Sequence, residues 1–369
     1  MLAASDSLSY AVSTDSIVSL NDYFQTACLH TAIQAAFAID LDVIANALQP
    51  LVQQYQRPFK RAERSPLYLK LLQICPKPLQ RSAVTLVSKC LGIDISMMEA
   101  LVRKTLEARL ERIRGEGPSS IGDTPSPDIL EGLLHRAHTR LSERALLKHA
   151  MTTMAASLEM LSNQLSWAIY ALSHPDNIAI QERLRTEIRA RFPSAPTTLA
   201  WEDISSLRYL SGVVNEVLRL YPNVSHRGRV CTVPTTVLEE PIPKGTILTW
   251  PVYAVNRDPA HWGLNADQFR PERWFLGEEN CTCHPRRNLF AFMTFGQGPH
   301  KCPGQHYTHA VMACMLFGLI GRFRFKRPAN DPDVINADAG TRVGFGIVMK
   351  ANIQASVIEV PGWSTMKSL

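Results

Sequence analysis

One cysteine in the sequence lies in a segment whose neighbours suit a reactive sulfur. The segment runs from Phe295 to Gly304 (FGQGPHKCPG), and a helical pattern begins directly afterwards at Gln305. Its glycines let the backbone approach a flat ligand closely. Free amides of such a turn can donate hydrogen bonds to a sulfur anion, and the positive end of the following helix points back at that sulfur. Both effects favour the thiolate of Cys302 over the thiol.

A cysteine in such a loop has two interpretations. A sulfur anion is the ligand that an iron porphyrin needs if the protein is to push electron density toward O–O cleavage. The alternative is a buried structural cysteine in an ordinary Gly/Pro loop. The demanding spacing of Phe, Gly, His, Cys and Gly favours the first interpretation, which makes Cys302 the predicted ligand of a haem iron.

The segment resembles the haem-binding signature of the cytochrome P450 family, Phe-x-x-Gly-x-Arg-x-Cys-x-Gly. Phe295, Gly298, Cys302 and Gly304 match it, and the resemblance implies that they form the haem site. His300 stands where the family usually has Arg. A His there would donate to a haem propionate as a weaker and pH-dependent partner.

Two further signatures follow in the order that the family has. Glu216 and Arg219 lie in NEVLR, which matches the Glu-x-x-Arg helix, and Arg273 lies in PERW. Spacing i, i+3 places Glu216 and Arg219 on one helical face, where such a pair is usually a surface ion pair. The resemblance implies instead that Arg273 joins them in a buried charge cluster behind the haem loop. It also places Arg229 where the family has a propionate-binding Arg; the alternative is a solvated side chain.

The residues that would face bound oxygen depart from the family. Aligning residues 165–175 with the end of the family's central helix places ASLEML over Ala-Gly-x-Asp/Glu-Thr-Thr. Glu159 then stands as the acid, while Met160 replaces the Thr that normally steers protons. We expect proton delivery through Glu159 with water or Ser162; otherwise the chain does not run standard oxygen activation. The alternative for Glu159 is a buried carboxylate that serves structure alone.

Helical patterns must position most of these residues. Apolar spacing predicts helices over 26–56, 97–114, 143–172, 203–220 and 305–323, and another that Asp176 caps and Arg191 ends. Residues 229–255 form short β-branched runs broken by Pro and Gly, which predict strands, and such runs return from residue 342. Residues 115–127 and most of 256–304 are predicted loops. The expected fold is therefore mainly α with a small β subdomain.

The resemblance implies a cytochrome P450-like fold that lacks its N-terminal portion, as a single domain over residues 1–369. Its parts would be a helical first half (1–142), the central helix with the Glu-x-x-Arg helix (143–228), and the β subdomain with the cysteine loop and last helix (229–369). The anchor, main sheet and Trp-bearing helix with which the family usually begins are not visible in residues 1–145. We expect either a truncated chain or a natural short form.

Composition limits the other classes of function. With 369 residues and 46% apolar content, the chain can bury a large core. The net charge of +6 is scattered, which fits ordinary solvated surface, an acidic redox partner or an anionic membrane surface. No basic stripe is interleaved with aromatics, so nucleic acid is not an expected partner. Neither a signal peptide nor about 20 uninterrupted apolar residues is visible. The expected location is the cytoplasm or, peripherally, the cytoplasmic face of the endoplasmic reticulum.

The eight cysteines do not form a secretory disulfide pattern in a chain of this length. Cys281, Cys283 and His284 resemble a metal clip. A second ligand pair at a suitable spacing is missing, which argues against zinc.

The resemblance implies a haem-thiolate monooxygenase with haem b, an NADPH-dependent reductase as electron donor and a small lipophilic substrate. The sequence is similar in style to fungal members that tailor secondary metabolites. The alternative is a degenerate member that acts as an inactive or non-oxidative binding or scaffold protein, which Met160 and His300 suggest. A purely structural helical protein would require all three ordered motifs to be accidents.

Overall fold

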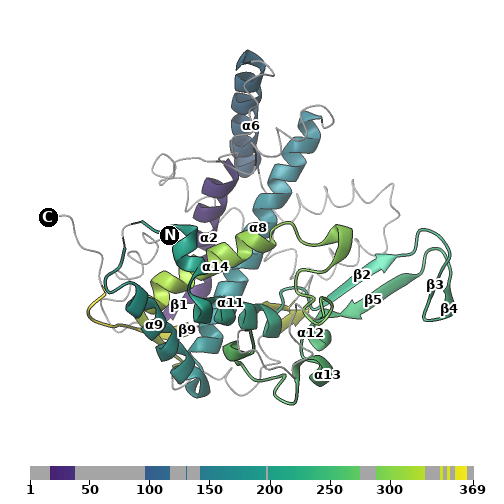
Figure 1. The fold of residues 1–369 in the computed structure, drawn as a ribbon. Coiled ribbons are helices and arrows are strands. Elements are labelled where there is room, and N and C mark those ends of the chain that lie inside the picture. Colours follow the sequence, from purple (N-terminus) through teal and green to yellow (C-terminus); the bar gives the residue numbers. More distant parts are fainter. Residues whose placement is uncertain are drawn as a thin grey trace. The chain divides into compact units, whose positions relative to one another are not determined.

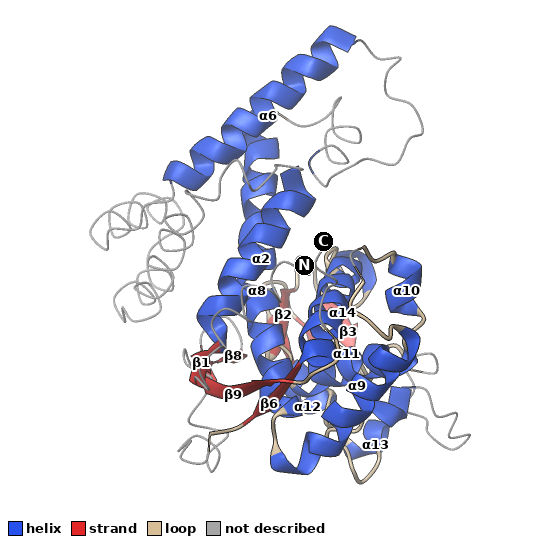
Figure 2. Ribbon diagram, turned by 90° about the vertical axis from the view of Figure 1, so that its left-hand side faces the viewer, coloured by secondary structure: helices blue, strands red, loops and turns tan. Residues whose placement is uncertain are grey.

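The computed structural model describes residues 17–37, 96–116, 130, 142–196, 198–274, 288–328, 341–343, 347–349 and 354–363. The chain falls into two compact units, one made of residues 1–24 and 160–369 and the other of residues 25–159. Helices dominate both units (Figures 1 and 2), and all strands in the described ranges belong to the first. The prediction of a mainly α fold with a small β part is confirmed. No helix among the described residues is long and apolar enough to cross a bilayer.

Among the described residues, the unit of residues 25–159 contains three helices. They are α2 (Leu20–Phe37), of which the first turn belongs to the other unit, α6 (Ser96–Glu116) and the first half of α8 (Glu143–Leu172). α6 and α8 confirm the helices predicted over 97–114 and 143–172. The remainder of the helix predicted over 26–56, and most of the predicted loop 115–127, lie outside the described residues.

Besides the second half of α8, the described part of the other unit contains four helices of five or more residues. They are α9 (Ile178–Arg191), α10 (Trp201–Ser205), α11 (Arg208–Leu220) and α14 (Gln305–Arg322). α11 contacts both α9 and α14, and almost all of its residues from Tyr209 onward are buried. It is therefore the central helix of this unit.

The single helix predicted over 203–220 is wrong, because the chain forms two helices with a break at Ser206 and Leu207. The hydroxyl of Ser206 donates to the carbonyl oxygen of Asp203 at 2.7 Å, which ends α10. The carboxylate of Glu187 then accepts the backbone N–H groups of Tyr209 and Leu210 at 2.8 and 3.0 Å. This cap comes from α9, so local sequence could not reveal it.

Replacing Glu187 by alanine should lower the free energy of unfolding by about 1–2 kcal/mol, because two amides at the start of α11 lose a charged acceptor. Urea unfolding of the full chain measures this loss. The exposed Glu202, changed to alanine, is the control and should alter stability by less than about 0.5 kcal/mol. Equal effects of the two substitutions would contradict the capping role.

The turn between α8 and α9 is capped by His174, and the prediction that Asp176 is the cap is wrong. Pro175 begins a short 3-10 turn (η3, Pro175–Asn177) and keeps His174 extended, with φ −61° and ψ 136°. The Nδ1 atom of His174 then accepts the N–H of Asp176 at 3.2 Å. Burial lowers the pKa of His174, and Arg327 adds to this effect, which favours the neutral ring that can accept this bond.

The strands form small antiparallel sheets. One has the order β1 (Ile17–Ser19), β9 (Gln354–Glu359), β6 (Phe323–Lys326), and the pairs are β2 (His226–Val230) with β5 (Ile247–Pro251), β3 (Thr235–Val237) with β4 (Glu240–Ile242) and β7 (Thr341–Val343) with β8 (Ile347–Met349). Figure 1 shows the β3–β4 hairpin at the far end of β2 and β5. These elements confirm the strands predicted between 229 and 250 and after 342.

The region predicted as strand and then loop also contains short helical turns. They are α12 (Val252–Val255), α13 (Pro259–Trp262), η4 (Pro271–Trp274) and η5 (Gly298–His300). The strand predicted as far as residue 255 is wrong over α12, because Pro251 has no N–H with which to continue the ladder. Cys281, Cys283 and His284 lie outside the described residues.

Two arginines of α9 hold the C-terminal end of α14. Arg185, 4% exposed, donates from Nε to the carbonyl oxygen of Ile320 at 3.0 Å and from Nη2 to that of Phe323 at 2.6 Å. Arg189 donates from Nε to the carbonyl oxygen of Gly321 at 3.0 Å. Carbonyls at a helix end have no partner within the helix, so these side chains fix α14 at the end opposite Cys302.

Candidate functional site

The sulfur loop, defined as residues 295–304, leads from the buried ring of Phe295 into α14. Cys302 is half-buried and free of any disulfide. Its backbone N–H donates to the carbonyl oxygen of Phe295 at 2.9 Å, which closes the loop on itself. Gly296 and Gly298 have φ values of +69° and +77°, a conformation that side chains disfavour. The loop therefore presents one sulfur from a fixed backbone directly before a helix.

Arg227 on β2 is the charged residue that the structure brings to this loop. Its Nη2 donates to the carbonyl oxygen of Thr294 at 2.9 Å, and a Cβ on Gly296 would lie only 3.1 Å from its Nη1. Burial lowers the pKa of Arg227, while the nearby Cys302 acts in the opposite direction because its anion favours the charged guanidinium. The Nε of Arg227 is buried and has no hydrogen-bond acceptor among the described residues.

Sequence reasoning proposed Arg229 and His300 instead of Arg227. Arg229 is exposed, donates to the carbonyl oxygen of Gly228 at 2.9 Å, and has its Cζ 5.5 Å from the ring centre of Trp250. His300 is exposed in η5. Residues 227 and 229 are two positions apart and therefore lie on the same face of β2. Strand spacing alone could not select between the two arginines.

The loop fits a haem held by a thiolate, by three observations. The sulfur of Cys302 is free of any disulfide. A Cβ on Gly304 would lie 3.8 Å from it, so the glycine leaves the space on that side of the sulfur without a side chain. A Cβ on Gly298 would meet no atom of the described part of the chain within 4 Å, which leaves room beside the loop there. The buried, unsatisfied Nε of Arg227 suits an anionic group such as a propionate.

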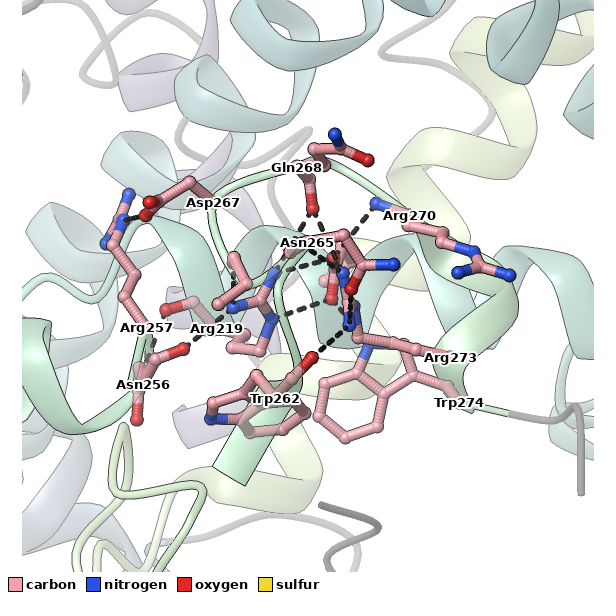
Figure 3. A network of polar contacts seen from close by, with 12 residues as sticks. Arg219, Asn256, Arg257, Trp262, Asn265, Asp267, Gln268, Arg270, Arg273 and Trp274 are labelled. Atoms are coloured by element: carbon pink, nitrogen blue, oxygen red, sulfur yellow. Dashed lines mark hydrogen bonds and ion pairs between the residues drawn. The ribbon is translucent and has the colours of Figure 1, made fainter. Parts of the chain in front are cut away.

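The predicted charge cluster is present and buried, and Figure 3 shows the network around it. Glu216 and Arg219 are both 0% exposed and pair through two hydrogen bonds of 2.8 and 2.9 Å. Arg273 Nε donates to the same carboxylate at 2.8 Å. Trp274 Nε1 and the backbone N–H of Arg270 complete its shell at 2.8 and 2.9 Å. Sequence reasoning thus identified the carboxylate of Glu216 and the two arginine side chains that bind it, but not the two N–H donors from Trp274 and Arg270.

Arg219 ties the cluster to the chain that follows β5. Its Nη1 donates to the carbonyl oxygens of Asn256 and Ala266 at 2.7 and 2.6 Å. Its Cζ lies 4.8 Å from the ring centre of Trp262, a cation–π contact. Burial lowers the pKa of Arg273, and the Glu216 carboxylate opposes this effect. The cluster therefore satisfies its buried charges through both side chains and backbone.

Asn256 and Thr294 connect the charge cluster to the sulfur loop. Asn256, 0% exposed, donates from Nδ2 to the carbonyl oxygen of Arg219 at 3.0 Å and to Thr294 Oγ at 2.8 Å. Its Oδ1 accepts the N–H of Met293 at 2.9 Å. The hydroxyl of Thr294 in turn donates to the carbonyl oxygen of Leu218 at 2.7 Å. Sequence reasoning missed both residues, because these bonds join segments that are 37 or more positions apart.

Glu159 is half-buried in α8 and belongs to the unit of residues 25–159, whereas Cys302 belongs to the other. Its assignment as the acid therefore stays a prediction. Met160 begins the second half of α8, and its carbonyl oxygen accepts a hydrogen bond from Asn223 Nδ2 at 2.8 Å.

The described residues contain no group of three His, Cys, Asp or Glu side chains that could hold a bare metal ion.

Comparisons with known proteins agree with the resemblance. The sequence model of the family described as "Cytochrome P450" matches residues 6–351. The chain is 37% identical over 223 residues to the cytochrome P450 monooxygenase sphH of Aspergillus fumigatus, covering 59% of this chain and 39% of that protein. It is 30% identical over 309 residues to the monooxygenase ALT8 of Alternaria alternata, covering 73% and 50%. It is 28% identical over 322 residues to the monooxygenase FSL4 of Gibberella zeae, covering 84% and 56%. The chain thus spans about half the length of these relatives, or less.

Proposed function

This chain belongs to the cytochrome P450 family, and we propose that it is a haem-thiolate monooxygenase in which Cys302 holds the iron of haem b. The observation that carries the proposal is the free sulfur of Cys302, fixed by the Phe295 carbonyl directly before α14, in a loop whose Gly296 lies beside Arg227. Haem bound through a thiolate supplies oxygen activation, because the electron-rich sulfur favours O–O cleavage. Phe295, Gly298 and Gly304 shape the loop that presents this sulfur.

Arg227 is proposed to bind a haem propionate through its buried Nε. This assignment selects Arg227 in place of Arg229 and His300, which the resemblance suggested and which are exposed. A guanidinium already held by the carbonyl oxygen of Thr294 is preorganised, so little side-chain entropy is lost when it binds an anion.

Arg227→Ala should weaken haem retention about tenfold or more, because a charge-assisted hydrogen bond in a partly buried site contributes about 1.5–3 kcal/mol. Arg229→Ala is the matched control and should change retention by less than about threefold. Haem transfer to apomyoglobin, followed by absorbance, measures both rates. Faster loss from the Arg229 variant than from the Arg227 variant would reverse the assignment.

Proton delivery is proposed to run through the carboxyl group of Glu159, with water or Ser162 as the next group. Glu159 and Ser162 are three residues apart in α8 and so share a face of that helix. Ser162 is 1% exposed, so its hydroxyl is shielded from bulk water. Met160 cannot take part, because a thioether carries no exchangeable proton.

The proposed substrate is a small lipophilic molecule, and the proposed electron donor is an NADPH-dependent reductase. The scattered positive charge of the chain suits an acidic redox partner. The similar proteins of Aspergillus, Gibberella and Alternaria are fungal monooxygenases. We propose that this chain acts in a tailoring step of fungal secondary-metabolite biosynthesis, and the fungal origin of these relatives supports that proposal.

Reconstitution with a reductase and NADPH tests the proposal. The protein should consume NADPH and oxygen and form an oxidised product from a lipophilic panel, and Cys302→Ala should do neither. Met160 favours a second candidate, a degenerate member that binds haem without oxygen chemistry. Haem retention with thiolate ligation but without any product would support that candidate and reject monooxygenation.

A further inference from the structure

His309 packs against the residue that fixes Cys302, and the proposed function gives it no role. It lies in the second turn of α14, and its ring centre is 5.4 Å from that of Phe295, with an angle of 37° between the planes. The carbonyl oxygen of Phe295 accepts the N–H of Cys302 at 2.9 Å. His309 therefore contacts the residue, Phe295, whose backbone carbonyl orients the sulfur of Cys302.

Both ring nitrogens of His309 are hydrogen-bonded. Nδ1 lies 2.8 Å from the carbonyl oxygen of Gln305, and Nε2 lies 2.9 Å from Oδ1 of Asn215 on α11. A backbone carbonyl can only accept, so Nδ1 carries the hydrogen. In a neutral ring Nε2 must then accept, which requires the Asn215 amide to turn so that its NH₂ group donates.

The surroundings favour that neutral ring. Burial lowers the pKa of His309, the Gln305 carbonyl opposes this effect, and His306 and Lys301 lower the pKa further. The groups facing the ring from the other two elements, Asn215 on α11 and Phe295 in the loop, carry no charge. The bonds therefore run in one direction, from the amide of Asn215 through His309 to the first turn of α14.

Asn215 links this chain of bonds to the charge cluster. It directly precedes Glu216, whose carboxylate binds Arg219 and Arg273. α11 is thus held on one side by the buried ion pairs and joined to α14 by His309. A shift of α11 relative to the sulfur loop would break the bond between Asn215 and His309.

We propose that His309 is a positioning residue that holds the sulfur loop against α11 through its bond to Asn215 and its packing on Phe295. The inference deepens the proposed function, since it assigns to His309 the retention of Cys302 as a thiolate ligand. His309 acts through Phe295 and the first turn of α14 and does not need to contact the haem.

Hydrogen–deuterium exchange of the haem-free full chain tests the positioning directly. His309→Phe keeps the ring stacking and removes both hydrogen bonds, and Asn215→Leu removes only the bond across the two helices. Each should speed exchange of the amides in the sulfur loop about tenfold, because local opening becomes easier when such bonds are lost. The double variant should be no faster than His309→Phe alone. The exposed His306→Phe is the control and should exchange like the parent.

Asn215→Asp gives a readout that a merely structural role would not move. A carboxylate offers only acceptors, so it pairs with a protonated His309 and raises the pKa of that ring. The pair's stabilisation is then present below the ordinary histidine pKa and is lost as pH rises through the raised value. Loop protection, corrected for intrinsic exchange, should fall between pH 6 and pH 8 in this variant and stay level in the parent.

The haem-loaded protein supplies the second test. After reduction and CO binding, His309→Phe and Asn215→Leu should each convert part of the red-shifted Soret band into the unshifted form, and His306→Phe should not. Loop exchange and spectra like the parent's in both variants would overturn the proposal, as would additive effects in the double variant. A parent that lacks the shifted band would reject ligation by Cys302, yet the exchange result would still decide the positioning role.

Discussion

Replacing Glu216 by alanine is expected to lower the free energy of unfolding by about 3–5 kcal/mol, because Arg219 would remain as a buried charge without its partner. Both side chains are 0% exposed, so water cannot solvate the orphaned guanidinium. The substitution also removes the acceptor for Arg273 and Trp274. Urea or thermal unfolding of the full chain measures the loss, and most of the protein should be insoluble at growth temperature.

The matched control is Glu359→Ala, which removes one partner of an ion pair with Arg322 at 2.9 Å. Glu359 is 47% exposed, so this change should cost about 0–1 kcal/mol. A similar cost for both substitutions would mean that the buried cluster does not stabilise the unit that carries the sulfur loop.

Cys302→Ala should abolish thiolate ligation completely, since no other residue of the sulfur loop carries a sulfur. Haem that still associates should give only the unshifted Soret band after reduction and CO binding. Product formation should fall below detection, because the electron-rich axial sulfur is gone. Cys302→Ser keeps the size and tests whether an alkoxide or water can replace the thiolate.

Cys314→Ala is the control for that experiment. Cys314 lies in α14, the helix that follows Cys302, and burial raises the pKa of its thiol, which marks it as an inert packing residue. Its variant should keep the shifted band. Loss of the shifted band in the Cys314 variant but not in the Cys302 variant would show that Cys302 is not the iron ligand.

Features encoded in short spacings could be predicted from the sequence. The Glu-x-x-Arg spacing placed Glu216 and Arg219 on one face of α11, and the structure buries them together with Arg273. The extent of α8 also followed from its periodicity, because a long apolar pattern without a breaker ends at Pro175.

Features that depend on contacts between distant segments could not be predicted. Asn256 looks like an ordinary loop residue in sequence, yet it joins Arg219 to Met293, two residues before the sulfur loop. The break between α10 and α11 depends on Glu187 from another helix. Arg227 and Arg229 differ only in how far along β2 they lie, and the position of the loop beside the strand decides which one is half-buried and which one is exposed.

The visible spectrum of the reduced, CO-bound parent protein tests the central claim most directly. Ligation by Cys302 predicts a red-shifted Soret band that disappears in Cys302→Ala and persists in Cys314→Ala. An unshifted band in the purified, haem-loaded parent would contradict the assignment of Cys302 as the iron ligand and, with it, the proposed monooxygenase.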